Sequence, residues 1–221
     1  MGFLQLAAAA LALTSSVSAS PVPVPEPQAV AAVSAKVCDA ATTICFSEWI
    51  SPEKISYRVA IPDTATAGTF DVLLQIVAPK TVGWAGIAWG GTMTNNPLAV
   101  AWANGATAVI TSRKASARTY PQVSADSSYT VLPGSGSNTT HWYITALSKG
   151  VSSWGTTKLD PASSAVSFAY AQSAAAVTEP ANPASRFSIH QSRGKFTIDL
   201  AGAKVANFAA LVEKASKPAA I

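Results

Sequence analysis

Between Ile44 and about Leu200 the sequence consists of short runs in which apolar and polar residues alternate, and Gly, Pro, Asn or Ser interrupts each run. A period of two is that of a β-strand with one buried face, so these runs predict strands. Their number and spacing favour an antiparallel β-sandwich of the immunoglobulin-like type. The expected strands are 55–61, 70–77, 84–89, 98–102, 109–112, 129–132, 142–146, 166–171 and 196–200.

Only the C-terminal part of the chain has a helical pattern. Within residues 203–215, Val205, Phe208 and Val212 recur at spacings of three and four, as on one face of a helix. The sequence therefore predicts an all-β sandwich with a short C-terminal helix.

The N-terminal region has the pattern of an exported protein. Residues 1–19 hold a short apolar run and end in Val17-Ser18-Ala19, which is typical of a secretory signal peptide. The run is shorter than the ~18 apolar residues that a membrane anchor needs. Residues 20–36 begin with four prolines in eight positions and predict an extended linker. We expect a sandwich domain at 37–215, a tail at 216–221 without a membrane or lipid-anchor signal, and a secreted, monomeric product.

Because a secreted protein enters an oxidising environment, its two cysteines are expected to form a disulfide. Cys38 and Cys45 are separated by six residues and can close a small hairpin loop as a disulfide. The C-x-x-C spacing of a redox-active pair is absent. Asn138 begins an Asn-Thr-Thr sequon in a Gly/Ser-rich loop, so we expect N-glycosylation there.

Composition and motifs exclude several classes of function. Hydrophobic residues make up 49% of the chain and charged residues 12%, so it can bury a substantial core. The net charge of +4 is scattered, without the basic stripe that nucleic-acid binding requires. The chain has no G-x-S-x-G elbow, H-E-x-x-H helix, P-loop or dinucleotide fingerprint. A carboxylate pair of the glycosidase type is neither favoured nor excluded.

The scarce ligand-forming residues are more informative. After Met1 the only methionine is Met93, in the turn-forming segment GGTMTNNP, and the only histidines are His141 and His190. A thioether in a Gly/Asn/Pro turn is an unusual core residue, although a methionine partly buried under a loop remains the simpler interpretation. Spacing alone does not choose between the histidines.

Three segments resemble the cytochrome domain of fungal cellobiose dehydrogenase. WAGIAWGGTMTNNPLAVAWANG, at 84–105, is similar to its haem-binding segment, with a Gly-Gly-x-Met turn before an apolar strand that ends in Val-Ala-Trp. NTTHWYI, at 138–144, resembles its Asn-Ser-Thr-His-Trp stretch. Residues 185–212 resemble its C-terminal segment, which contains a ligand histidine. The three motifs occur in the family's order and extend over most of the predicted domain.

The resemblance implies a β-sandwich that binds haem b through Met93 and His190, whereas His141 matches a histidine that does not bind iron. Trp84, Ile87, Trp89, Leu98, Val100 and Trp102 lie near these positions. Because side chains alternate along a strand, we expect one parity to line the haem and the other to fill the core.

The chain also departs from the family. Where a family tyrosine contacts a haem propionate in a Thr-Arg-x-Ala-Thr-Gly-Tyr stretch, this chain reads SRKASARTY, which places Arg118 at the matching position and Tyr120 two residues later. A cysteine pair found after the His-Trp motif in some members is missing. No fingerprint of a flavin domain is present, so the resemblance is to a free-standing cytochrome of the iron-reductase type.

The resemblance predicts one-electron transfer from an extracellular flavin dehydrogenase to a copper polysaccharide monooxygenase, ferric iron or a quinone, with ferric reductase activity left open. The alternative is a haem-free β-sandwich that binds carbohydrate or protein, with Trp84, Trp89 and Trp102 lining a sugar cleft. A degenerate cytochrome without cofactor is a third interpretation, against which the presence of both Met93 and His190 argues.

Overall fold

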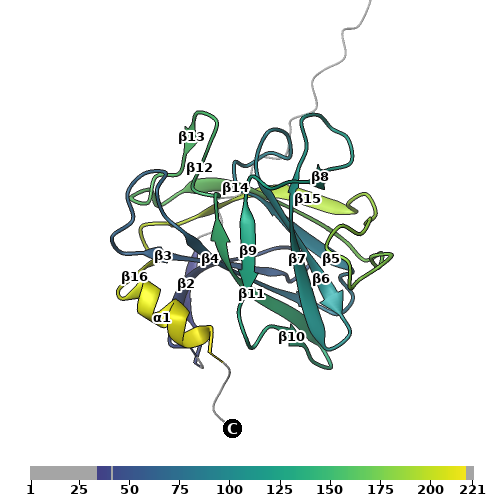
Figure 1. The fold of residues 1–221 in the computed structure, drawn as a ribbon, viewed down its shortest axis with the longest axis horizontal. Helices are drawn as coiled ribbons and strands as arrows, with labels where there is room; N and C mark the ends of the chain where they lie inside the picture. The colour runs from purple at the N-terminus through teal and green to yellow at the C-terminus, as the bar shows by residue number, and fades with distance from the viewer. Residues whose placement is uncertain (1–33, 41, 218–221) are drawn as a thin grey trace, which may run out of the picture.

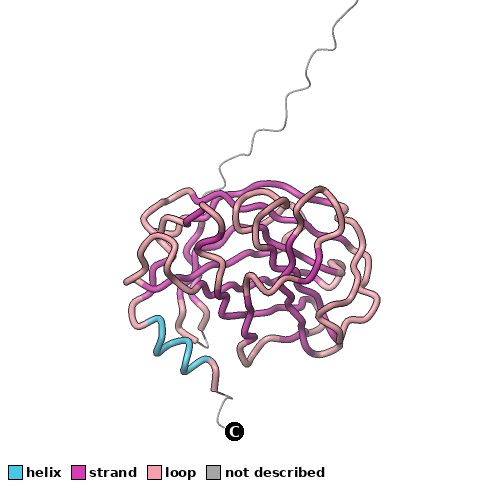
Figure 2. The backbone as a smooth tube through the Cα atoms, turned by 45° about the horizontal axis from the view of Figure 1, so that its top comes forward, coloured by secondary structure: helices cyan, strands magenta, loops and turns pink. Residues whose placement is uncertain are grey.

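The computed structural model describes residues 34–40 and 42–217, which form two large β-sheets, a small hairpin and one helix (Figure 1). The strands fill the body of the molecule, the loops lie around its margin, and the helix lies on one side (Figure 2). The predicted β-sandwich with a short C-terminal helix is confirmed.

The first sheet has the order β1-β2-β3-β4-β11-β10, with β9 also paired to β11 and β16 to β3. All its pairs are antiparallel except β16 with β3. Its strands are β1 (Ala35–Cys38), β2 (Cys45–Ile50), β3 (Ser56–Pro62), β4 (Val72–Pro79), β9 (Ser128–Val131), β10 (Gly136–Ser137), β11 (His141–Lys149) and β16 (Lys204–Val205).

The second sheet has the order β15-β14-β5-β6-β7-β8 and is antiparallel throughout. Its strands are β5 (Trp84–Ala88), β6 (Leu98–Asn104), β7 (Thr107–Lys114), β8 (Gln122–Val123), β14 (Val166–Ser173) and β15 (Ser192–Ile198). β12 (Ser153–Trp154) and β13 (Thr157–Lys158) form a separate hairpin.

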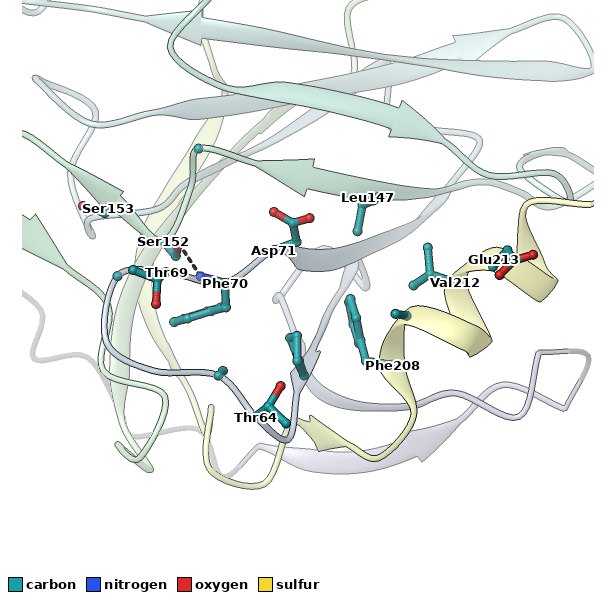
Figure 3. A pocket seen from close by; sticks show the side chains of 15 residues that line it. Thr64, Thr69, Phe70, Asp71, Leu147, Ser152, Ser153, Phe208, Val212 and Glu213 are labelled. Carbon is teal, nitrogen blue, oxygen red and sulfur yellow. Dashed lines mark hydrogen bonds between the residues drawn. The ribbon is translucent and has the colours of Figure 1, made fainter.

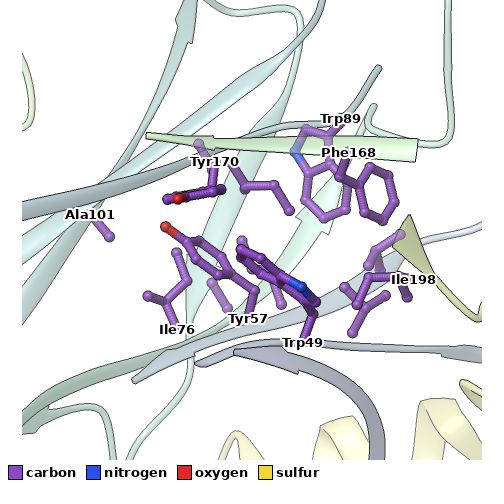
Figure 4. Close-up of a cluster of buried hydrophobic side chains, with 14 of the residues drawn as sticks. Trp49, Tyr57, Ile76, Trp89, Ala101, Phe168, Tyr170 and Ile198 are labelled. Carbon is purple, nitrogen blue, oxygen red and sulfur yellow. The ribbon is translucent and has the colours of Figure 1, made fainter. Parts of the chain in front are cut away.

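The main core lies between the two sheets and is rich in aromatic rings (Figure 4). Trp49 of the first sheet stacks on Phe196 of the second, with 4.2 Å between ring centroids. Trp89 meets Phe168 edge-on at 5.3 Å. Such contacts contribute beyond the apolar area that they bury, and the Trp49–Phe196 pair, which joins the two sheets, helps to fix how one sheet sits on the other.

The outward face of the first sheet carries a second apolar cluster, which helix α1 (Phe208–Ala215) covers. Phe208 and Val212 of the helix pack there with Phe46, Leu73 and Leu132. The prediction of a helix over 203–215 was wrong in its first turn. Residues 204 and 205 instead form β16, because their backbone pairs with the end of β3.

Each of the nine expected strands is present with shifted ends, and the largest shift is at β15, which was expected from 196 and begins at Ser192. The expected set did not include β1, β2 or the two-residue strands β8, β10, β12, β13 and β16. In β2 four consecutive residues, from Phe46 to Trp49, are buried, so its sequence does not alternate. Cys38 and Cys45 pair across β1 and β2 and are joined by a disulfide, as predicted.

The predictions of a signal peptide at 1–19 and of most of the 20–36 linker fall outside the described residues. β1 begins at Ala35, two residues before the expected start of the domain. Within the described part of the chain, no helix has the length and hydropathy needed to cross a membrane.

Candidate functional site

The outward face of the second sheet carries a third apolar cluster, and a loop rather than a helix covers part of it. Trp84, Val100 and Trp102 lie on this face, opposite in parity to the core residues Ile87 and Trp89. Residues 174–191, here called the covering loop, connect β14 to β15 and add Val177 and Phe187 to the cluster. In Figure 1 this loop is the yellow-green segment beside β5 and β6.

Hydrogen bonds from the sheet hold the covering loop in place. The indole Nε1 of Trp102 donates to the carbonyl of Pro180 at 2.8 Å, and that of Trp84 donates to Ser188 Oγ at 3.2 Å. Buried carbonyls in a loop need such donors because no neighbouring strand supplies them. The conformation of the covering loop therefore depends on side chains of β5 and β6.

Arg113 of β7 is the central anchor of this loop and is 2% exposed. Its Nη2 donates to the carbonyls of Pro183 and Ser185, both at 2.8 Å, and its guanidinium lies 5.4 Å from the Phe187 ring centroid. Burial lowers the pKa of Arg113. Its buried Nε has no hydrogen-bond partner, and no described carboxylate forms an ion pair with it. The face thus contains a buried cation without a counter-charge.

Beyond Trp84, the same face of β5 and β14 carries only small residues. Gly86 pairs with Ala171 and Ala88 with Ala169, and we call these four the small-residue stretch. A Cβ on Gly86 would lie 3.1 Å from the Ala99 carbonyl oxygen, so the backbone is closely packed there. Ala169 and Ala171 remain half-buried. The stretch forms a floor of small residues, of which Gly86 and Ala88 are buried, beside Trp84 and the covering loop.

Met93 lies in the loop between β5 and β6 and is half-buried. Asn96 shapes this loop: its Nδ2 donates to the Thr92 carbonyl at 2.9 Å, and its Oδ1 accepts a bond from Trp154 Nε1 at 2.8 Å. A Cβ on Gly90 would lie 2.2 Å from Asn96 Oδ1, which explains the glycine. The loop is therefore preorganised around Met93.

His190 lies near the end of the covering loop and is half-buried. The backbone N–H of the next residue, Gln191, donates to the Gln172 carbonyl at 2.8 Å, and Gln191 Oε1 accepts a bond from the Ala174 N–H at 2.8 Å. These bonds fix the backbone beside His190 against the end of β14.

Strand register places Met93 and His190 at opposite ends of the small-residue stretch. β5 ends at Ala88, opposite Ala169, and its loop continues beyond that level, where a Cβ on Gly91 would lie 2.6 Å from Ser167 Oγ. β15 begins at Ser192, opposite Gln172, so His190 precedes it at the other end of β14. A thioether and an imidazole thus flank one floor of small residues.

The other predicted site residues lie in different surroundings. Tyr120 packs on Phe187 with 5.2 Å between ring centroids, and its hydroxyl accepts a bond from the Phe187 N–H at 3.3 Å. Arg118 is exposed and has no ion pair with any described residue. His141 begins β11 in the first sheet and contacts Thr140 Oγ1 at 2.9 Å, so it is separate from this face. Asn138 is exposed.

The three tryptophans of the carbohydrate-binding alternative do not form an open cleft. Trp84 is 3% exposed, and Trp89 and Trp102 are 0% exposed. Their indole N–H groups already donate to partners within the protein, that of Trp89 to Tyr129 Oη at 3.0 Å. A sugar face needs an exposed ring, so this version of the alternative is not supported.

A separate groove of about 710 Å³ lies between α1 and the loop that precedes β4 (Figure 3). Phe70, Phe208 and Val212 line it, together with the carboxylates of Asp71 and Glu213. Asp71 lies 3.8 Å from Lys149 Nζ. None of the predicted site residues lines this groove. The described residues also contain no group of three or more His, Cys, Asp or Glu side chains arranged to hold a metal ion.

Sequence reasoning predicted Met93, His190, Arg118 and Tyr120 as site residues and did not single out Arg113. In the sequence, Arg113 is one polar residue near the end of a predicted strand. The signal that could have found it is parity, since Arg113 pairs with Leu98 and so shares the outward face with Val100 and Trp102.

Comparison with known proteins shows the family of this chain. Residues 37–210 match the model of the family described as the cytochrome domain of cellobiose dehydrogenase. A pyrroloquinoline quinone-dependent pyranose dehydrogenase from Coprinopsis cinerea is 27% identical over 171 residues, which are 75% of this chain but 23% of that protein. This chain therefore spans about a quarter of that relative's length.

Two solved structures have the same fold. The cytochrome b domain of Coprinopsis cinerea pyranose dehydrogenase superposes with a TM-score of 0.76 at 23% identity, covering 83% of this chain and 96% of that one. The cytochrome domain of Myriococcum thermophilum cellobiose dehydrogenase gives 0.75 at 22% identity, covering 85% and 99%. The family match spans most of the chain, and the chain belongs to the family of cellobiose dehydrogenase cytochrome domains.

Proposed function

We propose that the protein is a secreted b-type cytochrome that transfers single electrons, with haem b held by Met93 and His190. The observation that carries this proposal is their placement at the two ends of the small-residue stretch. A methionine thioether together with a neutral histidine imidazole is a ligand pair of electron-transfer cytochromes.

The lining of the face fits haem as a ligand. Trp84, Val100 and Phe187 supply an apolar wall, and the small-residue stretch supplies a floor without projecting side chains. The buried cation of Arg113, which lacks a carboxylate partner, supplies positive charge near a group that carries two propionates. Apolar walls with a few placed polar groups are the usual composition of a cofactor site.

Between the two candidates for a propionate contact, the packing favours Tyr120. Its ring belongs to the wall of the site, and its hydroxyl lies within the covering-loop contacts. The guanidinium of Arg186 lies 5.2 Å from the Tyr120 ring centroid and adds positive charge there. Arg118 is exposed, so we assign it no direct contact.

Bound haem would supply a reversible one-electron couple, and two protein ligands would leave the iron no open position for substrate. The protein's own part is to hold Met93 and His190, exclude water through the covering loop and neutralise the propionates. We propose a dehydrogenase as electron donor, of the flavin type that the resemblance to cellobiose dehydrogenase implies or of the quinone-dependent type named for the Coprinopsis cinerea relative. A copper polysaccharide monooxygenase or ferric iron is the proposed acceptor. We also propose glycosylation of the exposed Asn138.

The test is a visible spectrum of the protein expressed with haem available, first oxidised and then reduced with dithionite. We expect a sharp Soret band and resolved α and β bands on reduction. Met93→Ala and His190→Ala should each lose the low-spin spectrum, whereas the matched control His141→Ala should keep it. A wild-type protein that remains colourless after reconstitution with haem would overturn the proposal.

A further inference from the structure

The most exposed large apolar side chain of the described residues is Ile189, with 84% of its surface accessible. It directly precedes His190, which we propose as a haem ligand. An isolated exposed isoleucine on a soluble domain needs no explanation by itself. Its surroundings make this one informative.

Three basic residues lie within six positions of Ile189 in the sequence. Arg186 precedes it in the covering loop, and Arg193 and Lys195 follow it on β15. The register pairs Arg193 with Ala171 and Lys195 with Ala169, so both share the outward face with the small-residue stretch. All three side chains are exposed.

These cations are unpaired, unlike several others in the molecule. Lys114, Lys149 and Lys217 each have a carboxylate within ion-pair distance, whereas none of the described carboxylates pairs with Arg186, Arg193 or Lys195.

The two acids nearest along the chain are engaged locally. Glu179 accepts a bond from Asn182 Nδ2 at 2.8 Å, and Asp199 Oδ1 accepts one from the Gly202 N–H at 2.8 Å. No ion pair among the described residues therefore neutralises these three cations.

We propose that Ile189, Arg186, Arg193 and Lys195, here called the Ile189 face, dock a redox protein that presents carboxylates around an apolar spot. The inference rests on the proposed function, because it assigns this face to electron exchange beside His190. An exposed apolar centre excludes water where the two proteins touch. Unpaired surface charges speed the encounter of the two proteins without making the complex long-lived. This combination suits a small and transient interface.

The first experiment measures the oxidation of the dithionite-reduced protein by two small probes in a stopped-flow instrument. Ferricyanide is an anion and tris(phenanthroline)cobalt(III) is a cation, and each accepts one electron from the reduced protein. In the double variant Arg193→Glu/Lys195→Glu we expect the ferricyanide rate constant to fall roughly tenfold and the cobalt rate constant to rise. Both effects should shrink as salt is added, because exposed charges are screened.

The matched control reverses two exposed lysines elsewhere, Lys158→Glu/Lys214→Glu, on the small hairpin and on α1. It changes the net charge by the same amount and should alter both rate constants far less. Equal effects in the two double variants would overturn the inference, because the overall charge and not this face would then set the rates.

A second experiment separates a protein partner from a small ion. The probe is a plastocyanin with an acidic surface patch, oxidised and mixed with the reduced protein. Ile189→Ser should lower the rate with plastocyanin several-fold and leave the ferricyanide rate unchanged, while the control Val131→Ser, also at an exposed apolar residue, should change neither. An unchanged plastocyanin rate in Ile189→Ser, with a normal haem spectrum, would overturn the docking face alone. A wild-type protein without a haem spectrum would overturn both the docking face and the proposed function.

Discussion

The two sheets bury their outward faces in different ways. On the first sheet, α1 covers Phe46 and Leu73 with an apolar helix side. On the second, the covering loop lies over Trp84 and Trp102 and has no strand or helix of its own within the described residues. Both faces carry an apolar cluster, so they differ mainly in the element that covers the cluster.

A helix satisfies most of its own backbone groups, whereas a loop must borrow partners. The backbone of α1 therefore needs little from the sheet beneath it, and apolar contact suffices. The covering loop receives hydrogen bonds from Trp84, Trp102 and Arg113. The first face is therefore covered through apolar contact, whereas the cover of the second depends on polar side chains of the sheet.

The largest expected effect breaks the helix-covered face. Phe208→Ala removes a ring that is 7% exposed from the second cluster and should lower the free energy of unfolding by about 3 kcal/mol. Chemical denaturation measures this loss, and the half-buried Leu211→Ala should lose less. The haem spectrum of folded Phe208→Ala should equal that of wild type. A changed spectrum would show that the two faces are coupled.

The second prediction breaks the loop-covered face. Arg113→Met keeps the volume of the side chain but leaves the carbonyls of Pro183 and Ser185 without their donor. An unsatisfied buried polar group costs about 1–3 kcal/mol, and the loop can recover part of this by exposing itself to water. We expect a modest loss of global stability, faster hydrogen exchange across 177–188, and at least tenfold weaker haem binding.

Hydrogen-exchange mass spectrometry and a Soret titration of the haem-free protein measure these two effects separately. Lys158→Met is the control for loss of one cation at an exposed position. If exchange in the covering loop stayed at the wild-type rate in Arg113→Met, Arg113 would not be its anchor.

How well the sequence predicts these two sheet faces depends on how far apart along the chain the interacting residues lie. Alternation identified β6 and β14, but it did not say which parity faces the core, and only the structure places Val100 and Trp102 outward and Ile87 and Trp89 in the core. The sequence pattern failed at β2, where both faces are buried, and at residues 204–205, where pairing with β3 overrides a helical pattern.

The candidate site was only partly predictable for the same reason. Met93 and His190 came from a resemblance of local motifs, whereas the role of Arg113 depends on carbonyls about seventy residues later in the chain. A single sequence does not encode that contact in any local pattern.

A smaller effect on the same face is expected from one hydrogen bond. Trp102→Phe keeps an aromatic ring in the cluster but removes the donor to the Pro180 carbonyl. The loss should be about 1 kcal/mol, because a neutral hydrogen bond contributes about that much to stability. Thermal unfolding measures it, and Trp142→Phe, which removes the bond to the Val82 carbonyl in the main core, is a matched variant. Faster exchange confined to the covering loop should occur in Trp102→Phe alone.

The last prediction concerns the core between the two sheets. Its effect on stability is negligible at neutral pH and appears only in alkali. Tyr129 is half-buried, but its hydroxyl accepts the bond from the fully buried Trp89, and burial raises the pKa of Tyr129 to about 12. Because the folded state keeps this phenol neutral, its contribution is complete below the ordinary tyrosine pKa of about 10 and is lost as pH rises toward 12. Denaturation at several pH values should show stability falling across this window by more than in Tyr129→Phe, which lacks the ionising group. Parallel curves for the two proteins would mean that Tyr129 ionises freely, and that the Trp89 contact opens before the sheets separate.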